Sequence, residues 1–220
     1  GPRGLCRSAR VEERLQIGCI DAVRFGLARL LAELENWPII TEPEAVLSGV
    51  GNRLLPRLAR HMPALGVSSS FAEVPSDGGG HLITGGTGGL GLLTGRWLAQ
   101  RGARHLVLAS RSGALVNDTG AEWEAVQASD ATTSLARCDT VEAAHIRRLV
   151  ALAPSLDGVW HAAGVLADAL LPKQDAPGLS RVYAPKAHGA WCVHAMISAI
   201  EVRAFALFSS VAGLLGGPGQ

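Results

Sequence analysis

The chain has 220 residues, and its 20 basic residues nearly balance its 19 acidic ones, giving a formal net charge of +1. This balance provides no basic surface for nucleic acid or for an anionic membrane. Hydrophobic residues make up 48% of the chain, yet charges or glycines interrupt every apolar run before it could span a membrane. The length is sufficient for a full hydrophobic core in one large domain or two small ones.

The sequence of the first 75 residues predicts short strands and a short helix. We expect a buried strand at residues 14–22 and an amphipathic helix at 27–35. Two short apolar runs, 44–48 and 53–60, flank a Gly-Val-Gly-Asn turn and predict a hairpin. A polar, glycine-rich connector lies between residues 68 and 80, which places the best domain boundary there.

The second part of the chain alternates predicted strands and helices with short loops. The expected strands are 81–84, 105–109, 133–137, 158–161 and 204–208, and the expected helices are 90–100, 121–128, 141–152 and 186–199. Apolar strands without alternation, separated by helices, indicate a parallel sheet covered on both faces. With right-handed crossovers, this pattern predicts a doubly wound α/β fold that binds ligands beyond the carboxyl ends of its strands.

A glycine-rich turn follows the first of these strands. Its glycines have the spacing Gly86-x-Gly88-x-x-Gly91, and a helix-forming stretch begins at Leu90. In a dinucleotide-binding fingerprint, such glycines allow a tight turn and a close approach of the backbone to a pyrophosphate. The N-terminus of the following helix supplies free N–H groups and the positive end of its dipole.

The residues after the second strand indicate which dinucleotide is bound. An NAD site usually has Asp or Glu there for the ribose 2′-hydroxyl, whereas this strand ends in Ser110 and Arg111. An arginine offers a planar, permanently charged fork to a 2′-phosphate, and a serine adds a hydroxyl. NADPH is therefore the expected cofactor, and the alternative is a solvated arginine in a turn.

Two further positions are expected at the same edge of the sheet. Asp139 follows the third strand and could accept a hydrogen bond from the adenine amino group, cap the helix from Val141 onward, or do both. His161 ends the fourth strand and is expected to be structural rather than a catalytic base. The small residues that follow it would let the adenosine half lie against the backbone.

The four cysteines, Cys6, Cys19, Cys138 and Cys192, are widely spaced and form no CxxC pair. We expect reduced, cytoplasmic thiols that pack as small hydrophobic side chains, with neither disulfides nor a metal site.

In order and spacing, these motifs closely resemble the ketoreductase domain of modular polyketide synthases, a relative of the short-chain dehydrogenases/reductases. The matching stretches are residues 84–91, 108–113, 138–139, 161–168, 184–191 and 208–213. Residues 4–10 and 55–60 resemble, less specifically, the end of the family's structural subdomain, a degenerate Rossmann-like half without cofactor. The resemblance thus implies part of a structural subdomain at residues 1–78 and an NADPH-binding catalytic subdomain at 79–220 that is incomplete at its C-terminus.

The family reduces a β-ketoacyl thioester, carried on the phosphopantetheine of an acyl carrier protein, to a β-hydroxyacyl thioester. Motif matching implies that Lys186 and Ser210 are the catalytic lysine and serine. It implies that the cofactor is bound by Gly85, Gly86, Thr87, Gly88, Gly89, Leu90, Gly91, Ser110, Arg111, Cys138, Asp139, Ala162, Ala163, Gly164 and Lys186. The expected partners are the acyl carrier protein and neighbouring synthase domains, with no nucleic acid or membrane.

The resemblance places the family's proton-donating tyrosine, and an asparagine after it, just beyond Gln220. The chain's single tyrosine, Tyr183, is rejected as a substitute because Pro185 is expected in the first turn of the following helix, which would leave Tyr183 before that helix. This polypeptide alone is therefore expected to bind NADPH but to reduce little ketone.

The family's stereocontrol positions are only partly present. Leu166 and Asp168 match the first and last residues of a Leu-Asp-Asp motif, and Leu215 stands where the opposite class usually has tryptophan. Both features favour the class that gives a D-configured hydroxyl, although Asp168 could instead be a solvated loop acid.

Two other functions stay open. The chain could be a non-catalytic NADPH-binding or scaffold module of a multidomain synthase, since its proton donor is missing. It could also be a free-standing short-chain reductase, but the structural-subdomain remnant argues against that.

Overall fold

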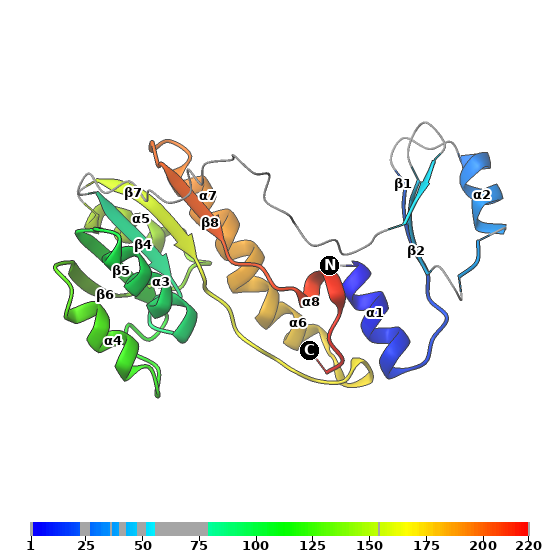
Figure 1. Cartoon of the computed structure of the whole chain (residues 1–220), viewed down its shortest axis with the longest axis horizontal. Helices are drawn as coiled ribbons and strands as arrows, with labels where there is room; N and C mark the ends of the chain where they lie inside the picture. Colours follow the sequence, from blue (N-terminus) through cyan, green and yellow to red (C-terminus); the bar gives the residue numbers. More distant parts are fainter. Residues whose placement is uncertain are drawn as a thin grey trace, which may run out of the picture. The chain divides into compact units, whose positions relative to one another are not determined.

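A computed structural model describes residues 2–22, 27–35, 37–39, 43–47, 52–55, 79–153 and 155–219. The chain divides into two compact units, each described by itself (Figure 1). Unit 1 comprises Gly1–Val67, Asp168–Gln174 and Ser209–Gln220, and unit 2 comprises Ser68–Ala167 and Asp175–Phe208. Most of the predicted connector, up to residue 78, lies outside the described residues.

Unit 2 contains a five-stranded sheet in which every neighbouring pair is parallel. In spatial order the strands are β6 (Thr132–Arg137), β5 (His105–Ser110), β4 (Gly80–Thr84), β7 (Leu156–His161) and β8 (Ala204–Leu207). Thr84 is in register with Ala109 on one side and His161 on the other, so three strands end side by side. The predicted doubly wound α/β fold is confirmed, and all five predicted strands are present.

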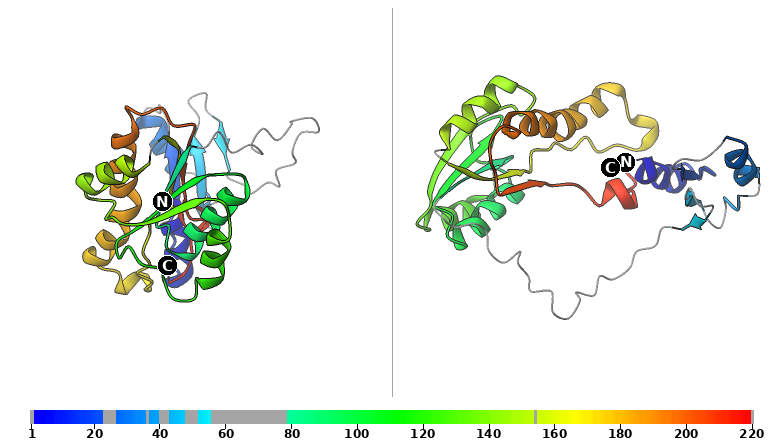
Figure 2. Two further views of the ribbon diagram at one scale, coloured as in Figure 1. Left: turned by 90° about the vertical axis from the view of Figure 1, so that its left-hand side faces the viewer. Right: turned by 90° about the horizontal axis from the view of Figure 1, so that it is seen from above.

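Helices cover both faces of this sheet (Figure 2). Helices α3 (Gly89–Gln100) and α4 (Gly120–Gln127) pack with Ile83, Leu106 and Leu108 on one face. On the other face, α5 (Ala143–Leu152) and α7 (Gly189–Ile197) pack with Leu82, Val107 and Val159. Adjacent strand residues thus enter opposite cores, which explains why these strands are apolar throughout.

The helix that carries Lys186 differs from the prediction. Helix α6 (Ala176–Tyr183) continues through a π turn, η3 (Ala184–His188), directly into α7. The expectation that Pro185 begins a new helix after Tyr183 was therefore wrong. A proline has no N–H to donate and crowds the preceding turn, and a π turn is one way for a helix to continue past it.

Unit 1 holds a small sheet in the order β1 (Cys19–Ala22), β2 (Glu44–Leu47) and β3 (Arg53–Leu54). Strands β2 and β3 are antiparallel, as the predicted hairpin requires, and helix α2 (Leu27–Glu35) is confirmed. The predicted buried strand at residues 14–22 was too long and too buried: only its last four residues form β1, which is parallel to β2 and partly exposed. Residues 56–60 of the second hairpin strand lie outside the described part.

Helix α1 (Pro2–Glu12) of unit 1 is joined to β2 by ion pairs. Glu44 is buried, and its carboxylate accepts hydrogen bonds from Arg7 Nη2 and from Arg10 Nη2, each at 2.6 Å. The hydrogen bond from Arg7 is the main cause that lowers the pKa of Glu44, against the effect of burial. None of the described helices combines the length and apolar character needed to cross a bilayer.

Candidate nucleotide-binding site

The glycine-rich turn connects β4 to α3 with backbone atoms packed closely on each other. Gly85 has a φ of +70°, a conformation that glycine adopts without strain. The turn is closed by a hydrogen bond from Gly88 N to Gly85 O at 3.1 Å and fixed to β5 by one from Gly86 N to Ala109 O at 3.0 Å. A Cβ on Gly86 would lie 2.6 Å from the carbonyl oxygen of Ile83, and one on Gly91 would collide with the carbonyl oxygen of Gly85. The turn therefore tolerates no side chain at these positions.

The N-terminus of α3 opens directly from this turn. The N-cap residue is Gly88, which has no side chain to accept from the free N–H groups of the helix. The first turn of α3 carries no acidic residue. The first N–H groups of an α-helix have no acceptor within the helix, and they favour an anionic group. The end of α3 is thus suited to a phosphate.

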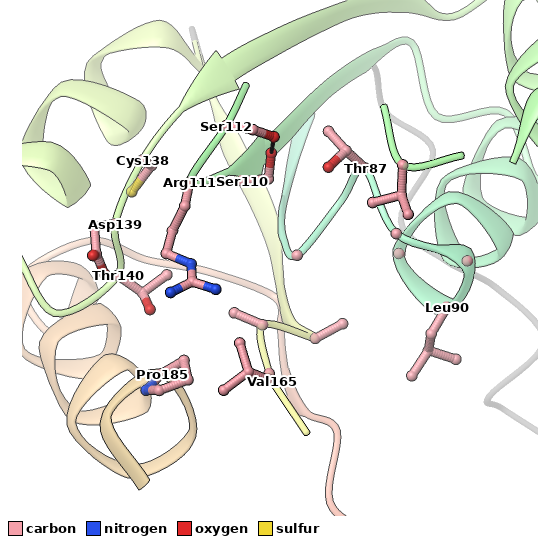
Figure 3. Close-up of a pocket in the computed structure, with 18 of the residues that line it drawn as sticks. Thr87, Leu90, Ser110, Arg111, Ser112, Cys138, Asp139, Thr140, Val165 and Pro185 are labelled. Atoms are coloured by element: carbon pink, nitrogen blue, oxygen red, sulfur yellow. Dashed lines mark hydrogen bonds between the residues drawn. The ribbon is translucent and has the colours of Figure 1, made fainter. Parts of the chain in front are cut away.

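A cavity of about 860 Å³ lies at the carboxyl ends of the strands (Figure 3). It is lined by residues from four strand ends and from η3: Gly85, Thr87–Gly91, Ser110–Ser112, Val116, Cys138–Thr140, Ala162–Leu166 and Pro185. This volume is in the range of cofactor pockets. Of the predicted cofactor-binding residues, only Gly86 and Lys186 do not line it, and Gly86 is buried within the turn.

Arg111 enters the cavity from the end of β5. Figure 3 shows its guanidinium extending toward the side lined by Thr140 and Pro185. The turn that carries it is fixed, because Ser110 Oγ accepts the N–H of Gly113 at 3.1 Å. A backbone bond from Gly113 N to Ser110 O reinforces this turn, and Gly113 has a φ of +68°. An exposed cation is thus held on a rigid turn at the mouth of the cavity.

Cys138 and Asp139 follow β6 and line the cavity near Arg111. Burial raises the pKa of the Cys138 thiol to about 11, so it is a neutral packing group at pH 7. Asp139 Oδ1 accepts the N–H of Val141 at 3.2 Å, while its own N–H donates to His145 Nδ1 at 3.2 Å. This bond closes a local turn and does not cap the helix as predicted, because α5 begins at Ala143 and its N-cap residue is Glu142. Among the described residues, Oδ2 has no hydrogen-bond partner and could accept from a ligand amino group.

Lys186 lies in the π turn η3, beside the cavity rather than within its lining. A Cβ built on Gly164 would lie 3.3 Å from Lys186 Cε, so the lysine side chain passes next to that glycine. Gly164 itself lines the cavity. Tyr183, by contrast, is 59% exposed, its ring packs edge-on against His188, and it does not line the cavity.

The other predicted catalytic and substrate residues are divided between the units. Leu166 is exposed at the rim of the cavity in unit 2. Asp168 and Ser210 belong to unit 1 and are both exposed. Ser210 Oγ accepts the N–H of Ala212 at 3.2 Å, which is a local strand-end bond that leaves the hydroxyl proton free to donate.

Five residues of the cavity were not predicted: Ser112, which lies beside Arg111 in the matched stretch 108–113, and also Val116, Thr140, Val165 and Pro185. Thr140 and Pro185 adjoin the predicted Asp139 and Lys186, and that adjacency was the available signal. Val165 lies within the matched stretch after His161. Val116 had no signal, because it lies in the loop after β5. The N–H of Val116 donates a hydrogen bond to Thr87 O at 3.2 Å, which holds the residue at the cavity.

Within unit 1, helix α1 binds two segments that belong to the predicted catalytic half. Glu12 accepts the N–H of Leu171, in the 3-10 turn η2 (Leu171–Lys173), at 2.5 Å and the N–H of Gly219 at 2.7 Å. One helical turn earlier, Ser8 Oγ accepts the N–H of Gly217 at 3.2 Å. The carboxylate therefore joins the segment after Asp168 to the segment after Ser210.

Replacing Glu12 with alanine is expected to speed amide hydrogen exchange at Leu171 and Gly219 several-fold, because both amides lose a charged acceptor. Those two hydrogen bonds lower the pKa of Glu12. Its stabilising effect is therefore complete above the ordinary pKa of glutamate and is lost as the pH falls through the lowered one. The difference between Glu12→Ala and the unaltered chain should vanish at acid pH. Glu13→Ala is the control, and an equal change in that variant would contradict the account.

Comparison with known proteins decides the family. The family model described as "KR domain" matches residues 79–220. The chain belongs to the KR domain family, the ketoreductase domains of modular polyketide synthases. The structure titled "Structure of A-type Ketoreductases from Modular Polyketide Synthase" superposes with a TM-score of 0.84 at 32% identity, covering 100% of this chain and 47% of that one.

The curated relatives of this KR chain are much longer proteins. Polyketide synthase GfsE of Streptomyces halstedii is 36% identical over 99% of this chain, which spans 5% of that protein. Erythronolide synthase EryA2 of Saccharopolyspora erythraea is 40% identical over 73% of this chain, and the match covers 4% of that protein. The KR assignment agrees with the resemblance inferred from the motifs.

Proposed function

We propose that this chain is part of an NADPH-dependent reductase of β-ketoacyl thioesters in polyketide biosynthesis. The observation that carries the proposal is a single cavity lined by the glycine turn, by Arg111 at the neighbouring strand end and by Gly164, beside which Lys186 passes. Reduced nicotinamide supplies the hydride in this chemistry.

The residues present fit the cofactor. The turn at Gly85–Gly91 and the first N–H groups of α3 would hold the pyrophosphate, because the glycines of this turn leave much of its backbone uncovered toward the cavity. Arg111 and Ser110 would bind the 2′-phosphate. Asp139 Oδ2 would accept the adenine amino group, and the backbone at residues 162–164 would lie along the adenosine half.

Two residues carry the proposed catalytic roles. Ser210 would donate its free hydroxyl proton to the substrate carbonyl, stabilising the negative charge that develops on oxygen. Lys186 would bind the nicotinamide ribose and lower the pKa of the proton donor through its positive charge. Leu166 and Asp168 stay predictions for stereocontrol, with a D-configured hydroxyl as the expected product.

The proposed partners follow from the substrate. The β-ketoacyl group would be carried on the phosphopantetheine of an acyl carrier protein, and other synthase domains would adjoin the reductase. The relatives are large synthases of which this chain spans a few per cent, which supports the proposal.

A second candidate is a non-catalytic NADPH-binding module. The observation that favours it is the chain's single tyrosine, Tyr183, which is exposed and does not line the cavity. Both candidates require the same nucleotide site, and they differ in whether a proton donor acts with Lys186 and Ser210.

The test compares this polypeptide with a longer product of the same reading frame that adds the next stretch of residues. Each is given NADPH and a β-ketoacyl N-acetylcysteamine thioester, and nicotinamide fluorescence and oxidation are followed. We expect both to bind NADPH, only the longer one to turn over, and Lys186→Ala to lower the kcat of the longer one at least about tenfold. Robust turnover by the 220-residue chain would contradict the missing-donor account. Failure of the longer polypeptide to turn over would favour the binding module.

A further inference from the structure

His161, at the end of β7, is hydrogen-bonded on both sides of its ring. The side chain is buried, with 3% of its surface exposed. Its Nδ1 lies 2.7 Å from Thr84 Oγ1, at the end of the neighbouring strand β4. Its Nε2 lies 2.9 Å from the carbonyl oxygen of Pro185, in the π turn. The ring therefore connects two strand ends of the sheet to the helix that carries Lys186.

These partners determine which nitrogen carries the proton. A carbonyl oxygen can only accept, so Nε2 must donate to Pro185. In the neutral ring, Nδ1 is then the acceptor and the Thr84 hydroxyl is its donor. Burial lowers the pKa of His161, and hydrogen bonds to the Pro185 and Lys186 backbone only partly oppose this, so the ring is neutral at pH 7.

The hydrogen bond from His161 falls where the helical ladder changes. In an α-helix the N–H of Gly189 would donate to Pro185 O, but here it donates to Ala184 O, one residue earlier. The carbonyl of Pro185 accepts from the His161 ring. His161 thus supplies a donor to a carbonyl that a regular helix would pair with Gly189.

The surrounding packing keeps this arrangement in one register. A Cβ on Gly189 would lie 3.3 Å from His161 Cε1 and would collide with the hydroxyl of Thr140. Residues before and after Lys186 are therefore both fixed against the sheet. A shift of one residue along the helix would rotate the lysine by about 100° around the helix axis, away from Gly164.

We propose that His161 is a positioning residue: by donating from Nε2 to the Pro185 carbonyl, it holds the π turn in the register that directs Lys186 past Gly164 toward the bound nucleotide. The importance of this position for NADPH rests on the proposed function. The geometry of the turn itself does not.

A double-mutant cycle on NADPH affinity in the 220-residue chain tests the link to Lys186. His161→Phe keeps a ring of similar size but cannot donate to Pro185, and we expect it to raise the Kd for NADPH about tenfold. In the Lys186→Ala background the same change should have little further effect, because the positioned group is gone. Equal effects in both backgrounds would overturn the proposal. The control is His105→Phe, because His105 is the first residue of β5 and thus lies at the amino ends of the parallel strands, away from the cavity.

A second measurement reads the turn without any cofactor. Long-range proton–nitrogen NMR spectra should show a protonated Nε2 and an unprotonated Nδ1 in His161. His161→Phe should shift the amide signals of residues 184–189, and His105→Phe should not. Thr84→Ser should preserve the Nε2–H form, whereas Thr84→Val removes the donor to Nδ1.

A protonated Nδ1 in the unaltered neutral ring, or unchanged signals at 184–189 in His161→Phe, would overturn the proposal. Absence of NADPH binding by the unaltered chain would instead contradict the proposed function.

Discussion

Arg111→Ala is expected to weaken NADPH binding about a hundredfold, because the change removes a charge-assisted, two-pronged contact to the 2′-phosphate. NADH lacks that phosphate, so its affinity should change by less than about threefold. Titration of each variant with both reduced cofactors, followed by nicotinamide fluorescence, measures the two effects side by side.

Two further variants separate shape from charge at Arg111. Arg111→Lys keeps the positive charge but loses the planar fork, and its affinity for NADPH should lie between those of alanine and arginine. Arg147→Ala removes an exposed arginine from α5 and controls for the change in net charge. Equal losses of NADPH and NADH in Arg111→Ala would show that the guanidinium does not contact the 2′-phosphate.

Gly91→Ala should reduce the affinity for both nicotinamide cofactors by more than about a hundredfold, since the new Cβ forces the phosphate turn open. That Cβ would collide with the Gly85 carbonyl oxygen and lie 2.6 Å from Gly86 Cα, and both are backbone atoms that cannot rotate away. Fluorescence titration measures the loss, and circular dichroism checks that the chain is folded.

Gly120→Ala is the matched control for Gly91→Ala. Gly120 is the first residue of α4, and a Cβ there meets no atom within 4 Å. The control should bind both cofactors like the unaltered chain. Full cofactor affinity in a folded Gly91→Ala variant would mean that the nucleotide does not use this turn.

The parallel sheet could be predicted because its strands carry a local signal. Leu82 and Ile83, or Val107 and Leu108, are apolar neighbours that enter opposite cores, a pattern typical of a strand covered on both faces. The positions of the glycine turn and Arg111 at the cavity could likewise be predicted, since fixed offsets from a strand end determine where such residues lie in this fold. Their roles in binding a nucleotide stay predictions.

The helix around Lys186 could not be predicted from local pattern. No element was predicted at residues 176–183, yet Asp175 caps α6 there by accepting the N–H of Gly178 at 2.7 Å. Pro185 looks like a helix start, but the ladder shifts there and His161, 24 residues earlier, donates to its carbonyl. A donor so distant in the chain leaves no periodic trace near residue 185.

Unit 1 was predicted less completely for the same reason. Glu12 bonds amides 159 and 207 residues away, and the Arg7 and Arg10 pairs with Glu44 also span dozens of residues. Such contacts decide where α1 and its partners lie, but they appear in the sequence only as scattered charges.

The most direct measurement is a crystal structure of this chain grown with NADP⁺. The account predicts the pyrophosphate against the amides at the start of α3, the 2′-phosphate against Arg111 and the nicotinamide ribose near Lys186. An empty cavity at saturating NADP⁺, or a nucleotide bound elsewhere on the chain, would contradict it.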